Sequence, residues 1–140
     1  MNTQLLTSID QVYKQSSIHA FKTIEQRQSD YEKELKVVSD IFEIDDLEAL
    51  FLIAIVINNT EYKVCQIEDI ANLLEISRFD ILKNLKVLFS LQSKKLIEIS
   101  DYEETNSETK KYLNRTTYPV EIMKKSIKIS KSVENKLFNI

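Results

Sequence analysis

The sequence of 140 residues contains no glycine, although about 7% of the residues in an average protein are glycine. Glycine is the residue that most readily adopts a positive φ and that lets the backbone approach a phosphate group closely. P-loops, dinucleotide-binding turns and the strained turn that carries a nucleophilic serine all depend on it. The absence of glycine therefore excludes these nucleotide-binding loops and this type of hydrolase site.

Cysteine and histidine are almost as scarce, because Cys65 and His19 are the single residues of their types. One cysteine cannot form an intramolecular disulfide, and the two residues together cannot supply the ligands of a Cys/His zinc site. We expect Cys65 to be a small buried hydrophobic residue and His19 to be structural or solvated. The sequence therefore predicts no metal, no cofactor and no enzymatic activity.

Long apolar segments and a targeting signal are also missing. The first ten residues lack the basic and apolar segments of a signal peptide. The longest apolar run, Ala49–Ile57, has nine residues, whereas about 20 are needed to span a bilayer. A single free cysteine is typical of a reducing compartment. These features predict a cytoplasmic protein that makes no membrane contact.

Charge is unevenly distributed along the chain, whose formal net charge is -3. Residues 1–60 contain five basic and ten acidic side chains, a net charge of -5, whereas residues 61–140 contain 14 basic and 12 acidic ones, a net charge of +2. A basic nucleic-acid-binding domain has a pI above about 9. Any nucleic-acid-binding surface is therefore expected to be a local patch in the second part of the chain.

Residues 3–40 have the apolar spacing of one long helix, with alternating steps of three and four that are typical of a heptad. A helix with so narrow an apolar stripe needs a partner, which is either the rest of its own chain or the same helix of a second copy. In the second case Phe21, Ile24, Tyr31, Leu35 and Val38 would form the contact of a homodimer. The complete stripe is Phe21, Ile24, Gln28, Tyr31, Leu35, Val38 and Phe42.

The next segment predicts a buried central helix. Asp45 followed three residues later by Glu48 is typical of a capping box at a helix start. The run Ala49–Ile57 is apolar on every side of such a helix, as expected of one buried in a core. The short polar side chains of residues 58–60 are expected to end it.

A helix-turn-helix is predicted directly after this central helix. Ile67–Leu74 has the pattern of a short amphipathic helix, and Ser77, with Asp80 three residues later, predicts the start of another helix that continues to Leu91. The two helices are separated by residues 75–77. Two short helices joined by so tight a turn are the helix-turn-helix motif.

The remaining segments predict strands and a final helix. Alternating or β-branched residues predict strands, and the polar residues 101–109 predict a loop between two of them. A last helix is expected to start at Ser130 or Ser132 and to run to Phe138. The expected strands are Lys63–Gln66, Lys94–Ile99, Lys111–Tyr118 and Ser126–Ile129.

This order of elements is that of a winged helix-turn-helix domain. The segment Cys65–Ser77 resembles the first helix and turn of that family, with Ala71 at the position where the two helices cross most closely. Glu75 stands where the family often has glycine, so a non-glycine residue must adopt the geometry of the turn. The resemblance implies an α+β, mostly α fold: a long helix over residues 1–40 and a winged-helix domain over residues 41–140.

More narrowly, residues 40–140 are similar to the winged-helix domain that precedes the ATPase core in some bacterial AAA-family ATPases. The points of likeness are Phe42–Leu52, Ile67–Ser77 and Ile127–Leu137. The likeness implies that the chain is an accessory or regulatory part of a larger protein. Its residues include no Walker motif, so ATP hydrolysis is not expected of them.

The winged-helix resemblance implies binding to double-stranded DNA through the second helix of the motif, which would enter the major groove, and through the hairpin, which would contact the backbone. Arginine and asparagine side chains read guanine and adenine edges, while lysines neutralise phosphates. The candidate DNA-binding residues are Arg78, Lys83, Asn84, Lys86, Lys94, Lys95, Lys110, Lys111 and Arg115.

Two functions stay open at this stage. Asp80 on the same helix and the acidic residues of the loop 101–108 would oppose a phosphate backbone. The basic residues also fit an ordinary solvated face, because a fold does not specify a function. The leading hypothesis is a DNA-binding accessory domain. The alternative is a non-enzymatic module for protein–protein interaction or assembly.

Overall fold

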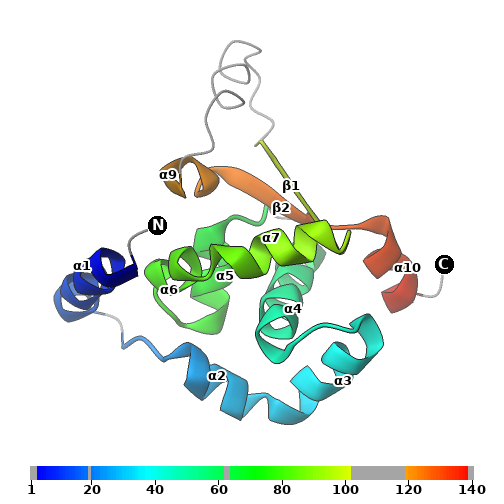
Figure 1. Ribbon diagram of the computed structural model, residues 1–140, viewed down its shortest axis with the longest axis horizontal. Coiled ribbons are helices and arrows are strands. Elements are labelled where there is room, and N and C mark those ends of the chain that lie inside the picture. Colours follow the sequence, from blue (N-terminus) through cyan, green and yellow to red (C-terminus); the bar gives the residue numbers. More distant parts are fainter. Residues whose placement is uncertain (1–2, 19, 62–63, 102–118, 139–140) are drawn as a thin grey trace.

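The computed structural model describes residues 3–18, 20–61, 64–101 and 119–138 (Figure 1). Its described part is mostly helical with one small antiparallel sheet, so the predicted α+β, mostly α class is confirmed. In chain order the elements are α1 (Thr3–Ser16), α2 (Ile24–Asp30), α3 (Glu32–Phe42), α4 (Asp46–Thr60), α5 (Ile67–Leu74), α6 (Arg78–Lys83), α7 (Leu85–Ser93), β1 (Ile97–Asp101), α9 (Pro119–Ile122), β2 (Lys125–Ile129) and α10 (Lys131–Phe138).

Helix α4 is the centre of the core, as its apolar sequence predicts (Figure 1). Asp45 caps it by accepting a hydrogen bond from Glu48 N at 2.8 Å, and Glu48 Oε1 accepts one from Asp45 N at 3.3 Å, so the predicted capping box is confirmed. The helix ends at Thr60, within the predicted polar segment. Helices α2, α3, α5 and α7 and strand β2 all pack against it.

The prediction of one continuous helix over residues 3–40 is wrong. The chain forms α1, α2 and α3 instead, with no helix over residues 20–23. Thr23 starts a new helix because its side chain accepts a hydrogen bond from Gln26 N at 3.1 Å, while the Gln26 side chain accepts one from Thr23 N at 2.9 Å. Tyr31, with φ -116° and ψ 24°, then separates α2 from α3.

The apolar stripe of this segment packs on the chain's own core. Ile24 and Leu35 are buried, and Val38 joins the residues packed against the core. Phe21 is half-buried, whereas Tyr31 is exposed. The chain's own core therefore covers part of this stripe, and α2 and α3 belong to the same core as α4, while a homodimer contact through the stripe stays a prediction.

The tight turn between α5 and α6 is formed as predicted. Glu75 ends α5 in the left-handed conformation, with φ 57° and ψ 35°, so a non-glycine residue does adopt the turn geometry. Ile76 fills the core directly after it. Ser77 caps α6 by accepting a hydrogen bond from Phe79 N at 3.1 Å. Two short helices joined by the predicted tight turn are therefore present, while the helix-turn-helix motif itself stays a prediction.

The second helix of the motif is shorter than the predicted span of residues 77–91, because it breaks at Asn84. The backbone N–H of Asn84 donates to Ile81 O, three residues back, while its side-chain Nδ2 donates to Asp80 O at 2.7 Å. That carbonyl is the acceptor that the backbone N–H would use in a continuous α-helix. The side chain thus replaces the helical hydrogen bond and divides the segment into α6 and α7.

The sheet pairs β1 with β2 in antiparallel register, with Ile97 opposite Ile129 and Ile99 opposite Ile127. The prediction of a strand near Ser126–Ile129 is confirmed, while the strand expected over Lys94–Ile99 starts at Ile97. Lys94 ends α7, and Lys95, with φ 61°, makes the turn into β1. The expected returning strand Lys111–Tyr118 lies outside the described residues.

Two further expectations concern the edges of the sheet. Val64–Gln66 form no strand, contrary to the prediction, although Cys65 O accepts a hydrogen bond from Ile127 N at 2.7 Å. One hydrogen bond is too little for a ladder, because a strand needs repeated pairing. The last helix is confirmed as α10: Ser130 caps it, accepting from Val133 N at 3.4 Å.

A substitution at the end of α3 tests how much a non-glycine residue in the left-handed backbone conformation lowers the free energy of unfolding. Glu43 has φ 57° and ψ 51°, is exposed and makes no ion pair with any described residue. Glu43→Gly is expected to raise the free energy of unfolding by about 0.5–1 kcal/mol in urea titrations, because glycine adopts this conformation without strain. Glu75→Gly should gain less, since it also removes a carboxylate that pairs with Arg27 and Lys22. Equal gains at both positions would contradict this reasoning.

Candidate functional site

The first candidate residue, Arg78, lies at the start of α6 but faces a carboxylate. Its Nη1 is 3.3 Å from Glu68 Oε2 on α5, and both side chains are 40% exposed. A surface ion pair of this kind contributes about 0–1 kcal/mol and can exchange partners. Arg78 is therefore accessible, although its charge is partly neutralised from α5.

Lys83 and Asp80 form an ion pair within α6 that is mostly covered. Lys83 Nζ lies 3.4 Å from Asp80 Oδ1, with the two side chains 18% and 11% exposed. The other carboxylate oxygen of Asp80, Oδ2, lies 3.3 Å from Nζ of Lys14 on α1. Asp80 thus joins α6 to the N-terminal helix, and α1 lies beside α6 at the edge of the molecule (Figure 1).

The remaining candidates that the structure describes differ in their surroundings. Asn84 uses its side-chain amide to break the helix. Lys94 Nζ contacts both oxygens of Glu48 at 2.9 Å. Lys86 and Lys95 are exposed and form no ion pair with any described residue. Lys110, Lys111 and Arg115 lie outside the described residues.

The helix-turn-helix segment has no excess of positive charge. Residues 67–93 contain three basic side chains and four acidic ones, a net charge of -1. The structure pairs two of the three cations with carboxylates of the same segment. A DNA-reading surface needs local positive potential, because phosphate neutralisation supplies much of the affinity. The basic members are Arg78, Lys83 and Lys86, and the acidic members are Glu68, Asp69, Glu75 and Asp80.

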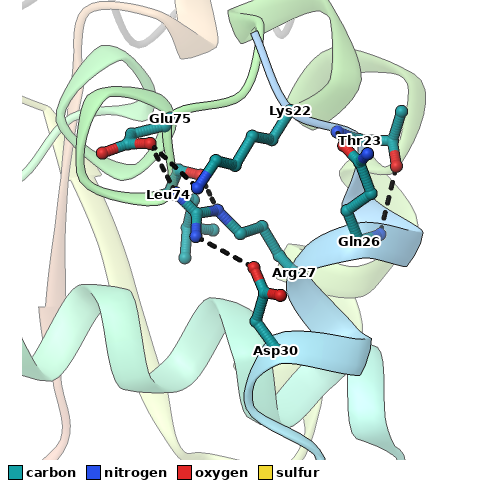
Figure 2. A network of polar contacts seen from close by, with 7 residues as sticks. All are labelled: Lys22, Thr23, Gln26, Arg27, Asp30, Leu74 and Glu75. Carbon is teal, nitrogen blue, oxygen red and sulfur yellow. Dashed lines mark hydrogen bonds and ion pairs between the residues drawn. The ribbon is translucent and has the colours of Figure 1, made fainter.

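A polar network around Arg27 holds α2 against the turn, as Figure 2 shows. The Arg27 side chain is 7% exposed; Nε donates to Leu74 O at 2.6 Å, and Nη2 donates to Glu75 Oε2 at 2.7 Å. Nη1 contacts Asp30 Oδ2 at 3.2 Å. In the sequence, Arg27 is a charged residue next to Gln28 of the apolar stripe. The pattern gives no signal of this contact, because the partners lie 47 and 48 residues away.

Cys65 has the environment of a core residue. It is 1% exposed, and burial, followed by the nearby charge of Asp69, raises the pKa of its thiol to about 12. A thiol with so high a pKa carries almost no thiolate at neutral pH and is a poor nucleophile. The prediction of a small buried hydrophobic residue is confirmed. His19 lies outside the described residues.

Among the described residues, no helix combines the length and the apolar character needed to cross a bilayer. The described residues contain two short helices joined by a tight turn, and a likeness to winged helix-turn-helix domains stays a prediction from the sequence. No protein-family model, no curated protein and no solved structure matches this chain.

Proposed function

We propose that this chain is a non-enzymatic protein-interaction module whose helix-turn-helix binds an α-helix of a partner. The observation that carries the proposal is the contact of α6 with α1, in which Asp80 meets Lys14 at 3.3 Å. The helix that a DNA-binding motif would place in the major groove is here in contact with a helix of the same chain. The resemblance noted in the sequence implies further that the module serves as an accessory part of a larger protein.

Electrostatics supports protein binding over DNA binding. A carboxylate at the contact attracts a cationic side chain and repels a phosphate. Asp80 is 8% exposed, so its charge is screened little by solvent. The net charge of -1 over residues 67–93 acts in the same direction.

DNA binding is the second candidate, because Lys86 and Lys95 are exposed and unpaired within the described part of the chain. Fluorescence anisotropy with duplex DNA over a salt series separates the two functions. For a protein-interaction module we expect Lys83→Glu/Lys86→Glu and Lys110→Glu/Lys111→Glu to change the affinity for the duplex less than about twofold, since both pairs would make non-specific contacts at most.

A DNA-binding function predicts different results in the same experiment. A DNA reader with four to six phosphate contacts would show a slope of log K against log salt of about -4 to -5. It would also lose more than about 2 kcal/mol on Lys83→Glu/Lys86→Glu, with an unchanged circular dichroism spectrum. That pair of observations would establish DNA binding as the function and reject the proposal.

A photo-crosslinking residue at position 86 provides the positive test. Lys86 is exposed and unpaired in the described residues, so its replacement leaves the fold intact. In cells that express the full chain, we expect crosslinked products that proteases remove and nucleases leave unchanged. Nuclease-sensitive products would contradict the proposal. Lys36, an exposed lysine of α3, is the matched control position.

A further inference from the structure

We propose that the face of α6 around Asp80 is a docking site for a short amphipathic helix with a lysine opposite that carboxylate, and that α1 is the internal occupant of this site. The inference rests on the proposed function and names the class of partner: a polypeptide helix with the chemistry of α1. The partner helix and α1 compete for one surface.

The chemistry of the site is fixed by Asp80. Its Oδ2 is buried and accepts no hydrogen bond from the described residues, while Lys14 Nζ lies 3.3 Å away. A buried carboxylate oxygen without a hydrogen bond is unfavourable unless a cation compensates it. Lys83 compensates Oδ1 from within α6, so the cation that faces Oδ2 is supplied by the docked helix.

The described apolar side chains of helix α1 contribute little burial to its contact with α6. None of its described side chains is buried, and the apolar residues Leu5, Ile9 and Val12 are 57%, 43% and 67% exposed. Burial of apolar side chains is the main source of packing stability. The described apolar side chains of α1 gain little of this, so the Lys14–Asp80 ion pair is the part of the contact that a competing helix would have to reproduce.

The connection between α1 and α2 allows such a release. Residues 20–23 form neither helix nor strand, and Ile18 is 96% exposed. The far end of the connection is fixed on the turn, where Lys22 N donates to Glu75 O at 2.9 Å and Lys22 Nζ lies 3.5 Å from Glu75 Oε2 (Figure 2). α1 can therefore leave α6 without displacing α2 or the Arg27 network.

A labelled peptide of residues 1–18 is the defined probe, and the full-length chain is the receptor. Lys14→Glu in the chain weakens its internal helix and leaves Asp80 in place, so the peptide should bind this variant about fivefold or more tightly than the wild-type chain. Asp80→Lys should abolish binding of the wild-type peptide. Lys36→Glu, an exposed charge change on α3, is the control and should bind like the wild type.

Reversing the charges completes the test. A peptide carrying Lys14→Glu should bind the Asp80→Lys chain and should not bind the Lys14→Glu chain, because only the first combination restores opposite charges. The inference would be overturned if the peptides bound neither the Lys14→Glu chain nor the Asp80→Lys chain. It would also be overturned if the affinities did not depend on these charges. If circular dichroism shows that the Asp80→Lys chain does not fold, the affinity of the wild-type peptide for the Lys14→Glu chain, compared with its affinity for the wild-type chain, still tests the inference.

The same measurements separate this inference from the proposed function. Protein crosslinks at position 86 without charge-dependent peptide binding would reject the α1-like partner and retain the protein-interaction module. Duplex DNA that displaces the peptide from the Lys14→Glu chain with a steep salt dependence would reject both.

Discussion

Arg27→Ala is expected to lower the free energy of unfolding by about 2–3 kcal/mol in urea titrations at neutral pH. The guanidinium is nearly buried and donates to Leu74 O at 2.6 Å and to Glu75 at 2.7 Å. Hydrogen bonds that involve a charged group contribute about 1.5–3 kcal/mol, and the lost side chain also packs between α2 and the turn. The figure stays below the sum of the bonds, because Glu75 and Asp30 are about half exposed and water can solvate them.

Two variants of the same network serve as controls. Lys22→Ala removes a lysine that pairs with the same Glu75 carboxylate at 3.5 Å, but this pair is exposed, so a loss below about 0.5 kcal/mol is expected. Arg27→Lys should recover only a small part of the stability, because the three N–H groups of an ammonium share one nitrogen and cannot reach the separate acceptors that Nε, Nη1 and Nη2 of the planar guanidinium contact. A loss in Lys22→Ala as large as that in Arg27→Ala would mean that the burial of Arg27 is irrelevant.

The parts of the fold that the sequence predicts correctly depend on residues close to one another in the chain. The capping box of α4 joins Asp45 and Glu48, and the cap of α6 joins Ser77 and Phe79. The left-handed turn at Glu75 follows from the need to join two helices within three residues. Such local hydrogen bonds can be recognised from spacing alone, because both partners lie within one helical turn.

The prediction of one continuous helix, which depended on the heptad spacing of residues 21–42, is wrong for a different reason. It identifies the buried side of a helix, and it says neither what covers that side nor whether the helix is continuous. Two short helices that fold back on α4 bury Ile24 and Leu35 as effectively as one long helix in a dimer would. The capping box at Thr23 and Gln26 is the local signal that could have located the break.

The surroundings of the candidate residues could not be predicted from the sequence, because they depend on contacts between distant residues. Lys94, expected at a phosphate, instead contacts Glu48 from 46 residues away. Asp80 meets Lys14 across the contact of α1 with α6. A list of exposed-looking lysines in a sequence gives their number and spacing, whereas the net field at a surface depends on which carboxylates fold next to them.

Glu48→Gln is expected to lower the free energy of unfolding by about 2 kcal/mol at pH 7. The side chain is 4% exposed, accepts from Ser90 Oγ at 2.9 Å and contacts Lys94 Nζ through both oxygens at 2.9 Å. The amide keeps the shape but loses the charge-assisted bonds, which contribute about 1.5–3 kcal/mol. Lys95→Gln, a neighbouring exposed lysine without an ion pair in the described residues, is the control and should change stability by less than about 0.5 kcal/mol.

The effect of Glu48→Gln on the free energy of unfolding depends on pH, and the direction of this dependence follows from the contacts of Glu48. Burial raises the pKa of Glu48, but the hydrogen bonds from Lys94, Ser90 and Asp45 N together outweigh it, so the pKa in the folded chain lies below the ordinary value of 4.5. A carboxylate with a lowered folded pKa stabilises the fold fully above the unfolded value and loses that contribution as the pH falls through the folded pKa. In urea titrations, the stability difference between wild type and Glu48→Gln should therefore be constant from pH 7 to pH 5 and shrink below pH 4.5. A difference that stayed constant down to pH 3 would show that the charge of Glu48 does not stabilise the contact between α4 and α7.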